Sequence, residues 1–375
     1  MDFRLSEEQD ALREVARDFL AARWPADKMR EALDAQPALV ADEVWKEIVE
    51  MGWLGVAAPE EVGGIGGGVV TAAVLAEEAG RGILPGPFLS SLAAALAAES
   101  CGDAALLADV IAGRRVTLAV EEPGGSWGPD AVRLAATPRG DGWSLSGTKI
   151  LVRDANEADL LLVAARTPEG LALLKVPADA AGLACNRMLL MDGQSAAELL
   201  LEDVHVEGGA RLGGAEACER GLREAYEKAT VMCAADLLGS AQASLELTTQ
   251  YAKDRVQFGR PIGSFQAVSH RLANDLMQLE IGRSLLYGAC LALDERRENA
   301  AALVSAAKAW LNEAAISAVE SALQIHGGVG FTWEYDVHLH MRRVRCNVAC
   351  HGDADFHRDR VALHMDASLG EGSTP

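Results

Sequence analysis

The sequence predicts an α+β protein in which an N-terminal helical domain is followed by an antiparallel β domain and a C-terminal helical bundle. Three observations predict this order. Helical periodicity dominates the first zone, short β-prone runs separated by turn residues fill the second, and helical periodicity returns in the third. We place the domains at residues 1–115, 116–210 and 211–375. Half of the 375 residues are hydrophobic, which is enough for a large core.

The first zone contains a clear helix start. Ser6 and Gln9 have the spacing of a capping box, and the apolar residues that follow, from Ala11 to Leu20, mark one helical face. Further helical stretches surround residues 45–51 and 70–80. The glycine-rich segment 59–68 lies between them, and we interpret it as a structural loop, because no strand precedes it and no lysine follows it.

The second zone has six β-prone runs, at residues 116–120, 132–136, 143–145, 160–165, 171–176 and 198–201. Turn residues at 138–142 separate two of them. From about Ala215 the pattern is helical again and runs without a proline to Asp254. Such a length is unusual for one globular helix, and it indicates a bundle that extends beyond one subunit.

Composition excludes several classes of function. The chain has 34 basic and 55 acidic residues, a formal charge of −21, and is therefore a poor match for nucleic acid or an anionic membrane. The N-terminal segment lacks the apolar core of a signal peptide, and no uncharged run approaches the ~20 residues of a membrane helix.

Seven cysteines without a CxxC pair favour reduced thiols in a cytoplasm. Cys346 and Cys350 lie beside His351, but a four-ligand set is not evident, and we expect no metal.

Two segments of the third zone carry chemistry. The first, residues 251–266, ends a helix with Arg255, Gln257 and Phe258, which can hold a pyrophosphate and flank a planar ring. The second, residues 324–335, places the amide of Gln324 before Gly327 and Gly328, whose bare backbone a phosphate or adenine can approach closely. Each segment alone also fits a capped helix end or an ordinary turn.

Together these segments resemble the acyl-CoA dehydrogenase family. The resemblance covers essentially the whole chain and includes Gly52-Trp53-Leu54-Gly55, Glu122-Pro123-Gly124-Gly125-Ser126 and Gly147-Thr148-Lys149. It implies a C-terminal four-helix bundle, FAD, an acyl-CoA thioester substrate and an electron-transfer acceptor. It also implies α,β-dehydrogenation, with a proton removed from the α-carbon and a hydride from the β-carbon. A further implication is a dimer or dimer of dimers that shares each flavin across an interface.

The sequence departs from the family at the catalytic positions. The family's usual carboxylate would fall on His351, and that of a second group within the family on Ala229. A relocated base would be His351 itself, Asp353, or Asp236, which lies about two helical turns beyond Ala229. The alternative interpretation is that His351 only fills the vacated space. The residues that hold the flavin ring in the family's β domain are also replaced, by Leu151, Arg153 and Glu121.

The retained residues belong to the other half of the site. In the family, the positions that match Arg255, Gln257, Phe258, Gln324, Gly327 and Gly328 reach across the interface to the neighbour's FAD. We therefore expect a half-site subunit of a heteromeric enzyme, paired with a homologous catalytic subunit. Residues 330–340 resemble the actinobacterial branch that acts on steroid-derived thioesters. The alternatives are a homo-oligomeric enzyme with a relocated base, and a cofactor-free scaffold. The arginines at 342, 343 and 345 fit either a basic patch for CoA or a salt-bridged helix surface.

Overall fold

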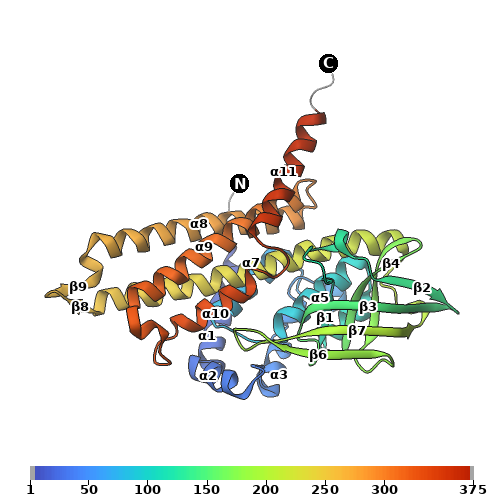
Figure 1. Ribbon diagram of the computed structural model, residues 1–375, viewed down its shortest axis with the longest axis horizontal. Coiled ribbons are helices and arrows are strands. Elements are labelled where there is room, and N and C mark those ends of the chain that lie inside the picture. Colours follow the sequence, from blue (N-terminus) through green and yellow to red (C-terminus); the bar gives the residue numbers. More distant parts are fainter. Residues whose placement is uncertain (1–4, 372–375) are drawn as a thin grey trace. The chain divides into compact units, whose positions relative to one another are not determined.

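The computed structural model describes residues 5–371, with side chains up to residue 366. The chain forms two compact units, each built from separate segments (Figure 1). The unit that we call the sheet unit consists of Arg30–Ala72 and Pro85–Ala229. The other, the bundle unit, takes in the chain up to Met29, Ala73–Leu84 and the chain from Thr230 onward. The domain limits at residues 115 and 210 stay a prediction.

The sheet unit contains one mixed sheet of seven strands. They are β1 (Val116–Ala119), β2 (Ala135–Arg139), β3 (Gly142–Arg153), β4 (Leu160–Thr167), β5 (Gly170–Pro177), β6 (Leu183–Leu189) and β7 (Ser195–Val206). Their order is β1-β4-β2-β3-β7-β6, and β5 pairs with β4. The prediction of an antiparallel domain holds for four of the pairings, but β1 and β2 both run parallel to β4.

Strand β6 was not predicted from the sequence. It lies at the edge of the sheet, and its residues from Asn186 to Leu189 are exposed. Its apolar and polar residues do not alternate along the chain as they do in a half-buried strand. Pairing with β7 therefore defines this strand more than its own composition does. Strand β3 is also much longer than the predicted run 143–145, because it continues through two register shifts to Arg153.

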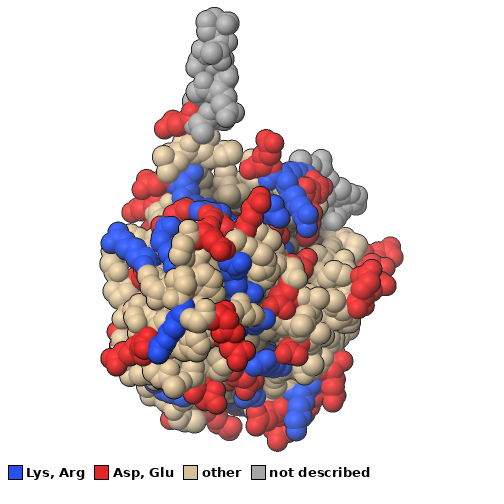
Figure 2. Space-filling view, turned by 90° about the vertical axis from the view of Figure 1, so that its right-hand side faces the viewer, with Lys and Arg blue, Asp and Glu red and all other residues tan. Residues whose placement is uncertain are grey.

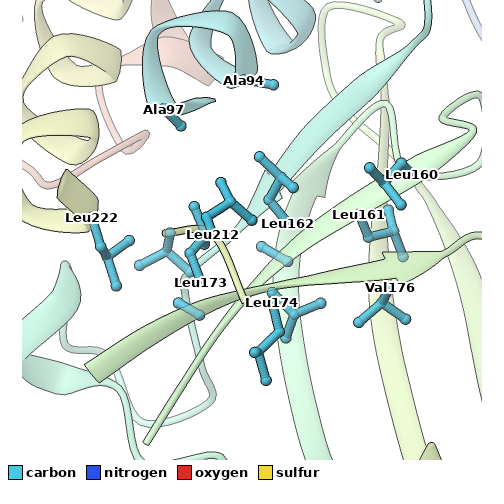
Figure 3. Close-up of a cluster of buried hydrophobic side chains, with 14 of the residues drawn as sticks. Ala94, Ala97, Leu160, Leu161, Leu162, Leu173, Leu174, Val176, Leu212 and Leu222 are labelled. Carbon is cyan, nitrogen blue, oxygen red and sulfur yellow. The ribbon is translucent and has the colours of Figure 1, made fainter. Parts of the chain in front are cut away.

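The core of the sheet unit lies between the sheet and its helices. The helices that contribute to this core are α5 (Phe88–Cys101), α6 (Ala104–Ile111) and the first part of α7 (Ala215–Asp254). The sheet unit also contains α3 (Asp42–Glu50) and most of α2 (Ala26–Ala35), which begins in the bundle unit. Figure 3 shows Leu162 and Leu173 of the sheet below Ala94 and Ala97 of α5, and Leu160 beside Leu161 and Val176. The first six residues of β4 are all buried, as expected for a strand that is covered on both faces.

The bundle unit is helical. Its helices are α1 (Glu7–Arg23), the end of α4 (Gly68–Arg81), the rest of α7, α8 (Gln266–Asp294), α9 (Ala300–His326), α10 (Val337–Asn347) and α11 (Ala354–Glu371). The predicted capping box starts α1, since Gln9 N donates to Ser6 Oγ at 3.2 Å and Ser6 N donates to Gln9 Oε1 at 3.0 Å. Helix α7 ends at Asp254, as predicted. Helices α8 and α9 run side by side (Figure 1).

Two glycines allow α4 and α7 to cross closely within the bundle unit. A Cβ atom added at Gly239 would lie 1.8 Å from Glu77 O, and one at Gly80 would lie 2.1 Å from Asp236 O. Both clashes are with backbone, so a side-chain rotation cannot relieve them. The helices must separate to accept any larger residue at this crossing.

Gly239→Ala is therefore expected to lower the free energy of unfolding by about 3 kcal/mol, at the upper end of overpacking costs. Urea denaturation measures it. Gly214→Ala is the matched control, because a Cβ atom there would meet nothing within 4 Å. Equal stability of the two variants would contradict the close crossing.

Acidic and basic side chains are interspersed on the face that Figure 2 shows. The excess of 21 negative charges is therefore not gathered into one acidic area on this face. No helix in the described part of the chain is long and apolar enough to cross a membrane.

Candidate functional site

The first sequence motif forms a hairpin at the end of α7. Strands β8 (Val256–Gln257) and β9 (Arg260–Pro261) pair, and Phe258 and Gly259 form the turn with φ values of 53° and 78°. Two positive φ angles are typical of a type I′ turn, which Gly accepts readily and Phe does not. The turn leaves Phe258 92% exposed, and Arg255 and Gln257 are exposed at the base of the hairpin.

The second motif ends α9 and continues into the 3-10 helix η6 (Gly327–Phe331). Gln324, Gly327 and Gly328 are exposed. A Cβ atom added at either glycine would meet nothing within 4 Å, so no other part of the described chain covers this backbone. Gly327 has φ 63° and ψ −141°, a conformation that favours glycine.

Three aromatic rings connect the two motifs. Tyr251, one turn before Arg255, stacks on His326 with ring centroids 4.2 Å apart. Tyr335 contacts both rings edge-on, at 5.7 and 5.5 Å. Burial lowers the pKa of His326, which favours its neutral form in this stack. The rings bring the hairpin and the end of α9 to the same end of the bundle unit (Figure 1).

The surface around these motifs is unusually apolar for exposed sequence. Phe331 is 69% exposed, and Trp333 and Tyr335 are also exposed. Exposed aromatic residues that cluster beside an arginine and bare glycine backbone mark a surface that another molecule covers. We call this set, comprising Arg255, Gln257, Phe258, Gln324, Gly327, Gly328, Phe331 and Trp333, the nucleotide-facing surface.

The residues of this surface fit the pyrophosphate and adenosine end of FAD. The exposed Arg255 offers a planar fork of donors for phosphate oxygens, and the open backbone at Gly327 and Gly328 leaves room for close approach. Exposed rings at Phe258 and Phe331 can lie against a purine.

The sheet-unit positions do not fit the flavin ring in the same way. The carboxylate of Glu121 accepts from Tyr226 Oη at 2.9 Å and from Gly128 N at 3.3 Å. Arg153 Nη1 donates to Gln194 Oε1 at 3.3 Å. Leu151 has φ 53° and is partly exposed. Glu121 and Arg153 thus bring charge to positions where the family resemblance implies uncharged groups, and both are bonded within their own unit.

His351 lies in the loop between α10 and α11, with φ 58°. Its side chain is half-buried, and its carbonyl accepts a hydrogen bond from His357 Nε2 at 3.0 Å. Lys308 Nζ, which is fully buried, donates to Asn347 O at 3.2 Å and to Gly352 O at 3.4 Å. The loop that carries His351 is therefore held from two sides.

The other two candidate bases have structural partners. Asp353 begins α11, where its Oδ1 accepts from Phe356 N at 2.9 Å in the manner of an N-cap. Asp236 is fully buried and accepts from Arg343 Nε at 2.8 Å and Nη2 at 2.6 Å. A fully buried carboxylate that is held by a buried guanidinium has no access to a substrate. This geometry favours a structural role for both residues. Ala229 is buried.

The basic group at 342–345 does not act as one patch. Arg343 is buried against Asp236, Arg345 forms an exposed ion pair with Glu320, and Arg342 lies over the ring of Trp333 at 5.5 Å. The sequence left two alternatives for this group, a basic patch for CoA and a salt-bridged helix surface. Arg345 belongs to a salt-bridged surface, whereas Arg342 lies beside the nucleotide-facing surface through its contact with Trp333.

Acid is expected to destabilise the bundle unit through two buried histidines. Burial, chiefly, lowers the pKa of His340 and of His357 to about 3, with nearby cations adding to the effect. The unfolded chain binds protons below pH ~6.5 while these side chains stay neutral in the folded state. As the pH is lowered from the unfolded-state pKa of about 6.5 to the folded-state pKa of about 3, the free energy of unfolding should fall by about 1.4 kcal/mol per pH unit for each histidine.

Urea denaturation across this pH range tests the expectation. His357→Gln should remove about half of the contribution from the two histidines, and His364→Gln, at an exposed position of α11, should leave the slope unchanged. A slope that is the same in the wild type and in His357→Gln would contradict the role of His357.

Sequence reasoning missed several residues that organise this region. The ring contacts of Tyr251 and His326 join segments far apart in sequence, and Lys308 has no sequence pattern that predicts its carbonyl partners. Only Tyr251 had a usable signal, since it lies four residues before Arg255 on the same helical face. Among the described residues, no group of three or more His, Cys, Asp or Glu side chains is arranged to hold a metal ion.

Comparison with known proteins gives consistent matches over the chain. The family model for the N-terminal domain of acyl-CoA dehydrogenase matches residues 6–108, and that for the C-terminal domain matches residues 222–365. The probable acyl-CoA dehydrogenase YngJ of Bacillus subtilis is 30% identical, with 97% of this chain and 100% of that protein covered.

Two solved structures are also similar. A variant of the Tcur3481-Tcur3483 steroid ACAD superposes with a TM-score of 0.89 at 33% identity, covering 97% of this chain and 99% of that one. A chain of the ChsE4-ChsE5 complex from Mycobacterium tuberculosis superposes with a TM-score of 0.89 at 27% identity, covering 100% of this chain and 100% of that one.

Proposed function

The chain belongs to the acyl-CoA dehydrogenase family, and on that premise we propose that it is the half-site subunit of a heteromeric acyl-CoA dehydrogenase. Its nucleotide-facing surface supplies the pyrophosphate and adenosine contacts to an FAD whose ring is held by a homologous catalytic subunit. The substrate of the assembly is an acyl-CoA thioester, and an electron-transfer acceptor reoxidises its FAD.

One contrast carries this proposal. The residues that face a neighbour's nucleotide are exposed and uncovered, whereas the positions for this chain's own base and flavin ring carry other chemistry. Neither His351 nor Ala229 is a carboxylate, and Glu121 bonds to Tyr226 instead of facing outward. A chain that had kept only the residues for its own base and flavin ring would show the opposite pattern, with the residues that face a neighbour's nucleotide replaced.

Within that assembly, this chain binds and orients. FAD, when bound, would accept the hydride that leaves the β-carbon of the acyl group. Arg255 would pair with the pyrophosphate, Gln324 would donate or accept at the adenosine end, and the bare backbone at Gly327 and Gly328 would allow close approach. The ring of Phe258 would help to exclude water from the shared edge of the site.

The similarity to the ChsE4-ChsE5 complex supports a heteromeric assembly, since that structure is a complex of two named subunits. The likeness to a steroid ACAD supports a bulky polycyclic acyl group as the substrate class.

The flavin-to-chain ratio tests the proposal. The chain purified alone is expected to bind FAD poorly and to lack dehydrogenase activity. Co-expression with its homologous partner should give one FAD for every two chains. A full complement of FAD in each copy of this chain, with turnover by the single protein, would overturn the proposal.

A second candidate is a homo-oligomeric enzyme that uses His351 as its base. The observation that favours it is the position of His351 in a conformation with positive φ, in a loop held by His357 and Lys308. It requires FAD in every subunit, and His351→Ala should then lower the rate by about 100-fold or more. Unchanged activity in that variant would exclude this candidate.

A further inference from the structure

We propose that the bundle unit contains a second small-molecule site, which takes an uncharged, largely apolar ligand with one acceptor oxygen, such as a ketone. The site is a cavity of about 430 Å³ between α1, the end of α4, the middle of α7 and the start of α10. All of its lining residues belong to the bundle unit. The inference goes beyond the proposed function and does not rest on it.

The indole of Trp24 identifies the polar group of the ligand. Trp24 ends α1, lines the cavity and is only 5% exposed. Its Nε1 is buried and has no hydrogen-bond partner among the described residues. A buried donor without an acceptor costs free energy, and the Trp N–H group normally finds a partner when it is buried. An acceptor oxygen on a bound molecule would provide that partner.

The walls of the cavity identify the rest of the ligand. Leu20, Met29, Ile83 and Leu247 all line it. Its volume falls within the roughly 300–1,000 Å³ of ordinary ligand pockets, which are mainly apolar with a few polar groups that fix orientation. A compact apolar skeleton would fill this space, with its oxygen directed at Trp24.

The charges in the lining exclude an anionic ligand. Arg17 donates to both carboxylate oxygens of Glu78, at 3.0 and 2.7 Å, and Arg81 is paired in the same two-point manner with Glu246. Each ion pair is neutral, and each guanidinium is already occupied by a carboxylate. Burial keeps His340 uncharged at neutral pH, since it lowers the pKa of that side chain to about 3. With Asp336 also in the lining, a CoA phosphate or a carboxylate would meet no cation without a carboxylate partner.

Fluorescent probes test the site on the full chain, both alone and in its co-expressed complex. Prodan is an uncharged aromatic ketone whose emission shifts to the blue in apolar surroundings, and N-phenylnaphthylamine is a similar apolar probe without a carbonyl. Both are expected to bind saturably at one site per chain with micromolar affinity. Absence of saturable binding by either probe would overturn the proposal.

Variants separate this cavity from other apolar surfaces. Leu247→Trp fills the cavity and should abolish binding of both probes. Leu276→Trp on α8 is the matched control, because Leu276 is about as exposed as Leu247, 45% against 41%, and lies outside the lining. Equal binding by these two variants would overturn the assignment of the site.

Trp24→Phe tests the hydrogen bond. It should weaken prodan binding about five-fold, the effect of losing one hydrogen bond, and leave N-phenylnaphthylamine unaffected. An equal loss for both probes would show a packing effect and overturn the role of Nε1. Thermal unfolding of each variant verifies that it is folded, and the flavin content of the complex, which depends on other residues, reports separately on the proposed function.

Discussion

Asp236→Ala is expected to lower the free energy of unfolding by about 3–5 kcal/mol, the cost of leaving a buried charge without its partner. The carboxylate of Asp236 on α7 holds Arg343 of α10 through two hydrogen bonds and also accepts one from Asn347. Arg343 Nη2 donates in turn to Leu84 O at 3.0 Å, beyond the end of α4. One buried ion pair thus connects three segments of the bundle unit, and its loss should be measurable by urea denaturation.

Two further variants show whether the charge itself is the cause. Glu320→Ala breaks the exposed pair with Arg345, and it should cost no more than about 1 kcal/mol. Asp236→Leu combined with Arg343→Met removes both charges and should regain most of the lost stability, because well-packed apolar residues often replace a buried pair without loss. A double variant as unstable as Asp236→Ala would contradict this account. Loss of activity in Asp236→Ala without loss of stability would instead favour a catalytic carboxylate.

Much of the fold was predictable because it depends on local patterns. The capping box of Ser6 and Gln9 and the unbroken helical pattern up to Asp254 are properties of neighbouring residues, and the structure has both. Strand β6 was missed because its pairing with β7 determines it, and the parallel pairing of β1 with β4 was missed because strand direction depends on the connection between strands.

The candidate site was predictable only in part, for a similar reason. Arg255 and Gly327 stand in local motifs, so their exposure at a helix end was expected. The stacking of Tyr251 on His326 depends on how α7 and α9 pack. The ion pair that makes Asp236 a poor candidate for a base depends in the same way on how α7 and α10 pack. Such contacts join residues far apart in the chain, and the local sequence around each residue does not indicate its partner.

Arg255→Ala is expected to weaken FAD binding by the heteromeric complex about 10- to 100-fold, since a hydrogen bond to a charged group contributes roughly 1.5–3 kcal/mol. Arg255 is exposed at the base of the β8–β9 hairpin, so its removal should leave the fold of the bundle unit intact. Fluorescence titration of FAD into the flavin-depleted complex measures the change. Arg255→Lys keeps the charge but loses the planar fork, and its affinity should lie between those of the wild type and Arg255→Ala.

The same hairpin provides a matched control for this prediction. Arg260 is also exposed, but its guanidinium lies over the ring of Phe265 at 4.0 Å, and Arg260→Ala should change FAD affinity far less. Adding Gln324→Ala to Arg255→Ala removes a contact from each motif and should leave the complex largely without flavin. Unchanged flavin content in that double variant would mean that the nucleotide-facing surface holds no cofactor, and the cofactor-free scaffold would then be the better interpretation. Since both residues come from this chain while the flavin ring would rest on its partner, loss of flavin would assign this chain the nucleotide-binding half of a shared site.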